Sequence, residues 1–169
     1  IVDNSDSEGA PVISEDNPSL PHLIGRVEHR AQFGTLITDF SLIKPGSVHA
    51  ANGGYLIIDA IKLLSQPFAW DTLKRTLRSE EVRIESPAEA LGMITTVSLE
   101  PEPIPLNLRV VLIGERQHYY LLNQYDPDFA NLFKVVADFN ESLVWNEENM
   151  SSYATLIASI ARSHDLRPL

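Results

Sequence analysis

The sequence predicts an α/β fold in which parallel strands form the core. Strand-like and helix-like segments follow one another in the order strand, helix, hairpin, strand, helix, strand, helix, which is typical of α/β proteins. The strongest strand candidates are apolar along most of their length, as expected of strands that are buried on both faces of a parallel sheet. With 169 residues, 44% of them hydrophobic, the chain is long enough for one packed domain or a piece of a larger one.

The clearest strand is Tyr55–Ile58, an apolar run that follows the turn residues Gly53 and Gly54 and leads into Asp59. A carboxylate at the C-terminal end of a buried strand is a frequent metal ligand or water-activating group in α/β proteins. The alternative is that this carboxylate caps the helix that follows. Asp59 is therefore the first candidate site residue.

A helix and a hairpin are predicted next. Pro67 suits a first helical turn, and Ala69 and Leu73 recur at helical spacing on the apolar face. Two segments with alternating side chains, 82–85 and 93–99, predict a β-hairpin inserted after this helix.

The second half of the chain supplies two more strand candidates and three helix candidates. Residues 108–113 predict a second buried strand, and residues 135–137 predict a third core strand. Short helices are expected over 119–124 and 126–133. A final helix, with Asn146 as its N-cap, gathers apolar residues on one face.

These elements divide the chain into three parts. Residues 1–21 form an acidic, loosely structured lead-in, residues 22–145 form the α/β core, and residues 146–169 begin a helical region. Residues 1–20 carry five carboxylates and no Lys or Arg, which is half of the net charge of −10. Such a charge run is typical of a solvated chain end.

Composition excludes several function classes. The net charge of −10 disfavours nucleic acid as a partner, because phosphate binding requires a cationic surface. The absence of Cys excludes disulfides, cysteine nucleophiles and thiolate zinc sites, and is consistent with a reducing compartment, so a cytoplasmic location is expected. No apolar run approaches the ~18 residues of a membrane-spanning helix, so no membrane segment is expected.

Catalytic motifs are also missing. The sequence has no Gly-x-x-x-x-Gly-Lys-Ser/Thr phosphate loop and no Gly-x-Ser-x-Gly nucleophile elbow. The five His residues show neither i, i+4 pairing nor a His-Glu-x-x-His pattern, so no metal site is predicted. No residue of this chain is therefore predicted to be catalytic. Asp59 is followed by Ala60, which cannot accept a proton.

Taken together, the segments resemble the AAA+ module of Lon-like ATP-dependent proteases (protease La homologues), in particular a bacterial branch related to archaeal B-type Lon. Each motif is weak alone, but the ordered set covers nearly the whole chain. The segments that carry the resemblance are 2–4, 9–12, 23–28, 46–59, 67–70, 100–105, 126–129 and 132–135.

The resemblance implies a partial AAA+ core of the P-loop NTPase type: the Walker B half, an inserted β-hairpin and the first helix of the lid. A P-loop region or its remnant would precede this segment in the full protein, and a proteolytic domain with a Ser–Lys dyad would follow it. The parent protein would be a serine endopeptidase that assembles as a ring, commonly a hexamer, and takes unfolded polypeptides as substrates. This chain alone would cleave nothing.

The same resemblance predicts a degenerate ATP site. Asp59 matches the Walker B Asp that holds the Mg²⁺ of ATP, but Ala60 replaces the Glu that polarises the attacking water. Glu115 stands where a sensor-1 Asn is expected, and Lys134 is the nearest cation to the position of the family's paired inter-subunit arginines. We therefore expect this chain to bind no ATP or Mg²⁺ by itself.

Two other interpretations remain open. In the first, the ATPase works only in the full-length hexamer, with Asp59 and Glu115 coordinating Mg²⁺ in an altered arrangement. In the second, the chain is a protein-interaction module with no enzymatic partner domain.

Overall fold

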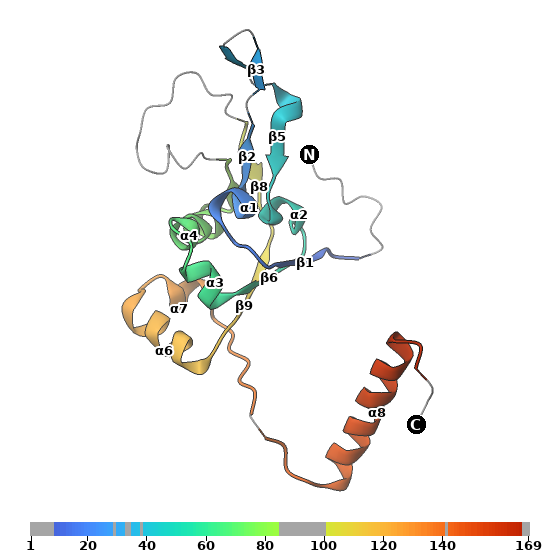
Figure 1. Cartoon of the computed structure of the whole chain (residues 1–169). Helices are drawn as coiled ribbons and strands as arrows, with labels where there is room; N and C mark the ends of the chain where they lie inside the picture. Colours follow the sequence, from blue (N-terminus) through green and yellow to red (C-terminus); the bar gives the residue numbers. More distant parts are fainter. Residues whose placement is uncertain are drawn as a thin grey trace. The chain divides into compact units, whose positions relative to one another are not determined.

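The computed structural model describes residues 9–28, 30–32, 35–37, 39–84, 101–140 and 142–166 (Figure 1). The chain forms two compact units, residues 1–134 and residues 135–169. The first unit holds every described element but one. Its elements, in chain order, are β1 (Val12–Glu15), α1 (Leu20–Ile24), β2 (Gly25–Val27), β3 (Arg30–Gln32), β4 (Thr35–Ile37), the 3-10 helix η1 (Phe40–Leu42), β5 (Ile43–Pro45), α2 (Ser47–Ala50), β6 (Tyr55–Asp59), α3 (Ala60–Leu64), α4 (Ala69–Ser79), β7 (Glu81–Val82), β8 (Ile104–Pro105), β9 (Arg109–Ile113), α6 (Arg116–Tyr125) and α7 (Phe129–Leu132).

A three-stranded parallel sheet in the order β1-β6-β9 forms the centre of the first unit. In its register Tyr55 lies between Val12 and Arg109, and Asp59 lies opposite Ile113. This confirms the α/β class and the parallel pairing of the two strands predicted at 55–58 and 108–113.

Strand β1 corrects the expectation that residues 1–21 are loosely structured throughout. Residues 12–15, with the sequence Val-Ile-Ser-Glu, form this strand within the acidic lead-in. The ladder begins where the backbone N–H of Tyr55 donates to the carbonyl of Pro11 at 2.8 Å. Because Ile13 packs against the core, one apolar side chain and a distant partner strand are enough to order this segment.

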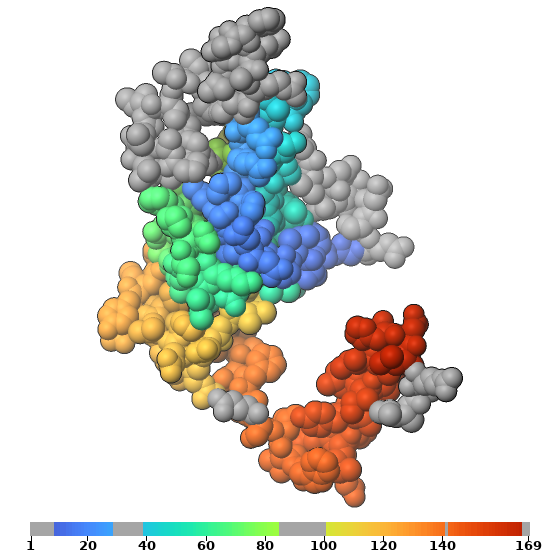
Figure 2. All heavy atoms as spheres, viewed as in Figure 1, coloured from blue at the N-terminus to red at the C-terminus, as the bar shows by residue number. Residues whose placement is uncertain are grey.

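One face of the sheet packs against helices. Leu56 and Ile58 of β6 are fully buried and join side chains from α1, α3 and α4 in a single core. In Figure 2 the atoms of α1 (blue) and α4 (green), two helices in contact, form one continuous mass. The buried hydrophobic members of this core are Leu20, Leu23, Ile24, Val48, Ala51, Leu56, Ile58, Leu63, Ala69, Leu73, Val82 and Leu108.

Two glycines allow backbones to approach where any side chain would collide. A Cβ on Gly54, just before β6, would lie 2.0 Å from the carbonyl oxygen of Pro11. A Cβ on Gly46, just before α2, would lie 2.2 Å from the carbonyl oxygen of Leu23 at the end of α1. Both glycines are needed for close contact, and neither forms part of a phosphate-binding loop.

The segment from β2 to β5 is an antiparallel arm of short strands. β2 pairs with β5, and β3 pairs with β4 further out. A third short antiparallel pair joins β7 to β8, with Val82 opposite Ile104. The hairpin predicted over 82–85 and 93–99 lies mostly outside the described residues.

Helix α4 (Ala69–Ser79) confirms the helix predicted around Ala69 and Leu73, but it begins two residues after Pro67. Its core face is buried. Its other face carries Trp70, Lys74 and Arg78, which follow one another at intervals of four residues.

The face of α4 that carries Trp70, Lys74 and Arg78 binds the turn that precedes α7. The carboxylate Oδ2 of Asp126 accepts from Trp70 Nε1 at 2.7 Å and from Lys74 Nζ at 2.8 Å. The side chains of Lys74 and Asp126 are only 13% and 12% exposed. One helical turn further on, Arg78 pairs with Asp128 at 2.6 Å. We call this set of contacts the α4 clasp.

Aromatic rings extend the clasp. Phe133 stacks on Trp70 with ring centroids 5.9 Å apart and on Phe129 with centroids 5.2 Å apart. The ring of Tyr119 meets Phe129 edge-on at 5.8 Å. Trp70 and Tyr119 thus belong to one aromatic cluster that joins α4, α6 and α7.

The second unit contains one described helix, α8 (Glu147–Ser163), which begins as predicted. The side chain of Asn146 accepts from the backbone N–H of Asn149. The strand predicted at 135–137 is wrong: these residues lie in an irregular segment, with Val135 90% and Val136 55% exposed. A strand requires a neighbour for its backbone groups, and no described strand pairs with this run.

The two compact units divide between 134 and 135, earlier than the boundary at 145/146 expected from the sequence. None of the helices in the described part of the chain combines the length and the apolar composition needed to cross a membrane.

Replacing Gly54 with Ala should destabilise the sheet. The added methyl group meets backbone atoms of Pro11, which cannot rotate away, so the free energy of unfolding should fall by about 2 kcal/mol or more. Urea denaturation measures this change. Gly9→Ala is the matched control, because nothing lies within 4 Å of its added Cβ. Equal effects of the two substitutions would contradict the close approach.

Asp126→Asn should weaken the α4 clasp. Burial alone raises the pKa of Asp126, but hydrogen bonds from Lys74, from Trp70 and from the backbone of Asp128 outweigh it, so its pKa lies below the ordinary value. The folded carboxyl thus holds its proton less tightly than the unfolded one. Its contribution to stability is complete above pH 3.8 and is lost as the pH falls through the lower folded pKa.

Urea denaturation at neutral pH should therefore show a loss of about 1–3 kcal/mol for Asp126→Asn. The difference from the wild type should shrink as the pH approaches about 2. Asp71→Asn is the control, because Asp71 also pairs with Lys74 but its side chain is 82% exposed. A difference that stays constant down to low pH would contradict this role of the charge.

Candidate functional site

The candidate site lies at the edge of the parallel sheet where β6 and β9 end. Asp59 closes β6, and Ile113 lies opposite it at the end of β9. Both strands lead directly into helices, α3 and α6 (Figure 1). In open α/β sheets, ligands bind outside the carboxyl ends of the strands.

Asp59 caps helix α3. Its Oδ1 accepts from the backbone N–H of Lys62 at 2.9 Å, and its backbone is extended as in an N-cap residue. The helix-capping alternative left open by the sequence is thus realised in the structure. One carboxylate oxygen is engaged, and the group is held in a fixed orientation at the edge.

Ala60, the residue after the carboxylate, is almost fully buried, with 4% exposure. It faces Gly114, where a Cβ would lie 3.1 Å from the Cβ of Ala60. The position therefore carries no proton acceptor, and a longer side chain would have to enter a tight contact between α3 and the end of β9.

Glu115 follows Gly114 and stands at the N-cap position of α6, yet its side chain accepts no capping hydrogen bond. The residue is exposed. Asp59 ends β6, and Glu115 follows the end of the neighbouring strand β9 by two residues, so both lie at the same edge of the sheet. Their carboxylates make this edge acidic.

His118, which the sequence did not single out, lies beside this edge. Its Nδ1 is buried and has no hydrogen-bond partner among the described residues, and it lies 3.9 Å from the position of a Cβ on Gly114. The only signal for His118 in the sequence is its position one helical turn after Glu115, on the helix that follows β9.

Of the other histidines, His49 has a structural role. Its Nδ1 lies 3.4 Å from the backbone N of Gly46 and can accept a hydrogen bond from that N–H group. Burial lowers the pKa of this imidazole, which favours the neutral form that can accept. Within the described ranges, no three His, Asp or Glu side chains gather in a way that could hold a metal ion.

Lys134 is exposed and directly follows Phe133 of the aromatic stack. It lies at the end of the first unit, after α7, and it has no recorded contact with Asp59 or Glu115. An inter-subunit role for Lys134 stays a prediction.

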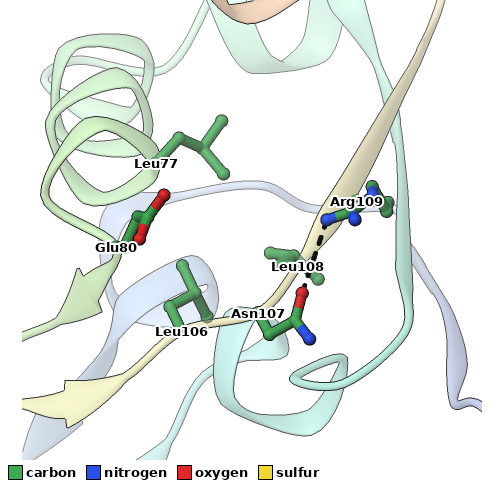
Figure 3. A pocket seen from close by; sticks show the side chains of 6 residues that line it. All are labelled: Leu77, Glu80, Leu106, Asn107, Leu108 and Arg109. Atoms are coloured by element: carbon green, nitrogen blue, oxygen red, sulfur yellow. Dashed lines mark hydrogen bonds between the residues drawn. The ribbon is translucent and has the colours of Figure 1, made fainter.

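A cavity of about 360 Å³ lies near the other end of β9 (Figure 3). Leu77 and Leu106 border it, Glu80 lies beside Leu77, and Arg109 donates to Asn107 at 3.4 Å. Because Arg109 begins β9 whereas Asp59 lies opposite its last residue, this cavity is separate from the candidate site.

The family model described as "LonB-like, AAA domain" matches residues 8–140. A protein from Escherichia coli (strain K12), described as a candidate Lon protease homolog, is 29% identical over 125 residues, which cover 73% of this chain and 20% of that protein. A protein of the same description from Haemophilus influenzae is 32% identical over 118 residues, covering 63% of this chain and 18% of that protein. The chain thus spans about a fifth of the length of these relatives.

Among solved structures, NtrX from Brucella abortus is similar with a TM-score of 0.56 at 15% identity, over 94% of this chain and 33% of NtrX. The same protein in complex with ADP gives a TM-score of 0.59 at 13% identity, over 94% of this chain and 32% of NtrX. At these identities the likeness concerns the fold alone, and it agrees with a partial AAA+ core. The sheet, the carboxylate at its edge and a family match over most of the sequence lead to one assignment: the chain belongs to the LonB-like AAA domain family.

Proposed function

We propose that this chain is the Walker B half of the AAA+ module of a Lon-like ATP-dependent serine protease, and that its ATP site is degenerate. In this role it assists ring assembly and substrate handling, while peptide bonds are cleaved by another part of the protein. The observation that carries the proposal is Ala60, which follows the edge carboxylate, is buried against Gly114 and offers no proton acceptor.

ATP hydrolysis needs a residue that orients or deprotonates the attacking water, and a carboxylate that holds Mg²⁺ against the phosphates. The first requirement falls on position 60, where the side chain is a methyl group. For the second, Asp59 has one oxygen already accepting from the backbone of α3. The exposed Glu115 adds a second negative charge close to where the phosphates would lie. The residues at this edge therefore fit a hydrolytic Mg²⁺–ATP site poorly.

Ring assembly and substrate handling rest on the family match and on the length of the relatives. The chain spans about a fifth of those proteins. Lon-type proteolysis with a Ser–Lys dyad, hexamer formation and the choice of unfolded polypeptides as substrates are accordingly assigned to the longer protein.

The full-length protein should hydrolyse ATP no faster than a sample without protein. Asp59→Asn should leave this background rate of ATP hydrolysis unchanged. The substitution removes only the charge and keeps the fold, because Asn caps a helix about as well as Asp. The measurement is the rate of phosphate release from ATP with and without Mg²⁺. Asp71→Asn, which removes a carboxylate away from the candidate site, is the control. Turnover that Asp59→Asn abolishes and Asp71→Asn preserves would instead establish an ATPase active only in the full-length assembly.

Helix capping is the role that remains for Asp59 in this proposal. Asp59→Ala should lower the free energy of unfolding by about 1 kcal/mol, whereas Asp59→Asn should change it by a few tenths. Urea denaturation of the two variants distinguishes these outcomes. Equal losses for Ala and Asn would show that the negative charge, and not the cap, is what the fold requires.

A further inference from the structure

Asn52 and Gly53 are the only Asn-Gly pair in the sequence, and they lie in the turn directly before β6. Gly53 is exposed and has a φ of +85°, a backbone conformation that favours glycine. Both residues bond to the segment that connects β8 to β9. The turn thereby ties the start of β6 to the start of β9, at the end of the sheet away from Asp59.

Three hydrogen bonds make this tie. The side-chain Nδ2 of Asn52 donates to the carbonyl of Pro105 at 2.9 Å, and its Oδ1 accepts from the backbone N–H of Asn107 at 2.8 Å. The N–H of Gly53 donates to the carbonyl of Asn107 at 2.9 Å. We call these three contacts the Asn52 bracket. They engage both ends of the Asn52 amide and the backbone N–H that follows it.

The Asn52 bracket fits few other residues. Asp at position 52 would have no N–H group to offer the carbonyl of Pro105, and Gln would carry its amide one methylene further out. At position 53 a residue other than glycine would have a strained backbone. The fold therefore uses an Asn-Gly pair at this turn.

An Asn-Gly pair is chemically labile, because glycine leaves the backbone nitrogen sterically open to react with the preceding side chain. In this reaction the nitrogen of Gly53 loses its proton and attacks Cγ of Asn52. The new N–Cγ bond closes a five-membered succinimide, while the Cγ–Nδ2 bond breaks and ammonia leaves. Water then opens the ring at either carbonyl, which gives aspartate or isoaspartate. Water is the only co-reactant.

We propose that Asn52 is a latent deamidation site, which reacts only when residues 105–107 separate from the turn while the sheet stays paired. In the closed bracket the N–H of Gly53 is bonded to Asn107, and the Asn52 amide is held at both ends, so Cγ is not free to rotate onto the nitrogen. Opening of the bracket releases all three groups. No nucleotide is involved, so the proposal stands or falls separately from the proposed function.

The product cannot close the bracket again. A carboxylate at position 52 has no donor for the carbonyl of Pro105, and its second oxygen would face that carbonyl. Isoaspartate also adds a methylene to the backbone just before Gly54, where the chain passes so close to Pro11 that no Cβ fits. Deamidation therefore makes the opening permanent and weakens the start of the sheet.

The rate of deamidation in the folded and the unfolded protein tests the protection. Peptide mapping by mass spectrometry, after incubation at mildly alkaline pH, follows aspartate and isoaspartate at position 52. They should form at least about tenfold more slowly in the folded protein than in the same protein in guanidinium chloride. Asn131, which Leu132 follows, is the internal control and should stay intact in both samples. Equal rates at Asn52 in the two samples would overturn the proposal.

Two substitutions of Asn107 test whether the bracket itself gives the protection. Asn107→Pro removes the N–H that donates to Asn52 and should accelerate deamidation of the folded protein at least about threefold. Asn107→Ala is the matched control, because it keeps that N–H and removes only the side chain at the cavity, which accepts from Arg109 (Figure 3). Equal rates in the two variants would contradict the role of the bracket.

Hydrogen exchange in the wild type tests the same opening without a substitution. The N–H of Gly53 exchanges when the bracket opens, so folding should slow its exchange and the deamidation of Asn52 by factors that agree within about tenfold. The amide of Arg109, which donates to Gly54, reports opening of the sheet and should be protected more strongly. Deamidation slowed as much as the exchange of Arg109, or equal protection of the two amides, would overturn the proposal, because the reaction would then require the sheet to open.

Discussion

The pairing of β6 on both sides is the constraint on which the rest of the structure depends. β1 and β9 both pair with β6, and two backbone hydrogen bonds fix where the pairing begins. The N–H of Tyr55 donates to the carbonyl of Pro11, and the N–H of Arg109 donates to the carbonyl of Gly54. Since the three strands run parallel, this register also brings the ends of β6 and β9 together at one edge. The candidate site is therefore a consequence of how the sheet is assembled.

At that edge the same carboxylate can serve two purposes that compete for its oxygens. In this chain Asp59 gives one oxygen to the first turn of α3, and the residue after it is a small apolar side chain packed on Gly114. An active site of this kind needs a base at the position of Ala60. In the proposed function the acid therefore serves as a helix cap, and position 60 offers no base beside it.

Strong local patterns predicted the correct elements. The apolar runs at 55–58 and 108–113, the helical spacing of Ala69 and Leu73, and the cap at Asn146 were sufficient. Elements set by distant partners were missed. β1 is ordered by its pairing with β6, and the run at 135–137 is apolar but finds no described strand to pair with. His118 was missed because the burial of its Nδ1, which has no hydrogen-bond partner among the described residues, cannot be read from the sequence.

Magnesium dependence of nucleotide binding is the most direct test of a degenerate site. Equilibrium dialysis of the full-length protein against labelled ATP, with Mg²⁺ and with EDTA, measures it without relying on turnover. Our account predicts that Mg²⁺ does not tighten binding, because one oxygen of the edge carboxylate is engaged in the cap of α3. Micromolar binding that requires Mg²⁺ and disappears in Asp59→Asn would contradict the account.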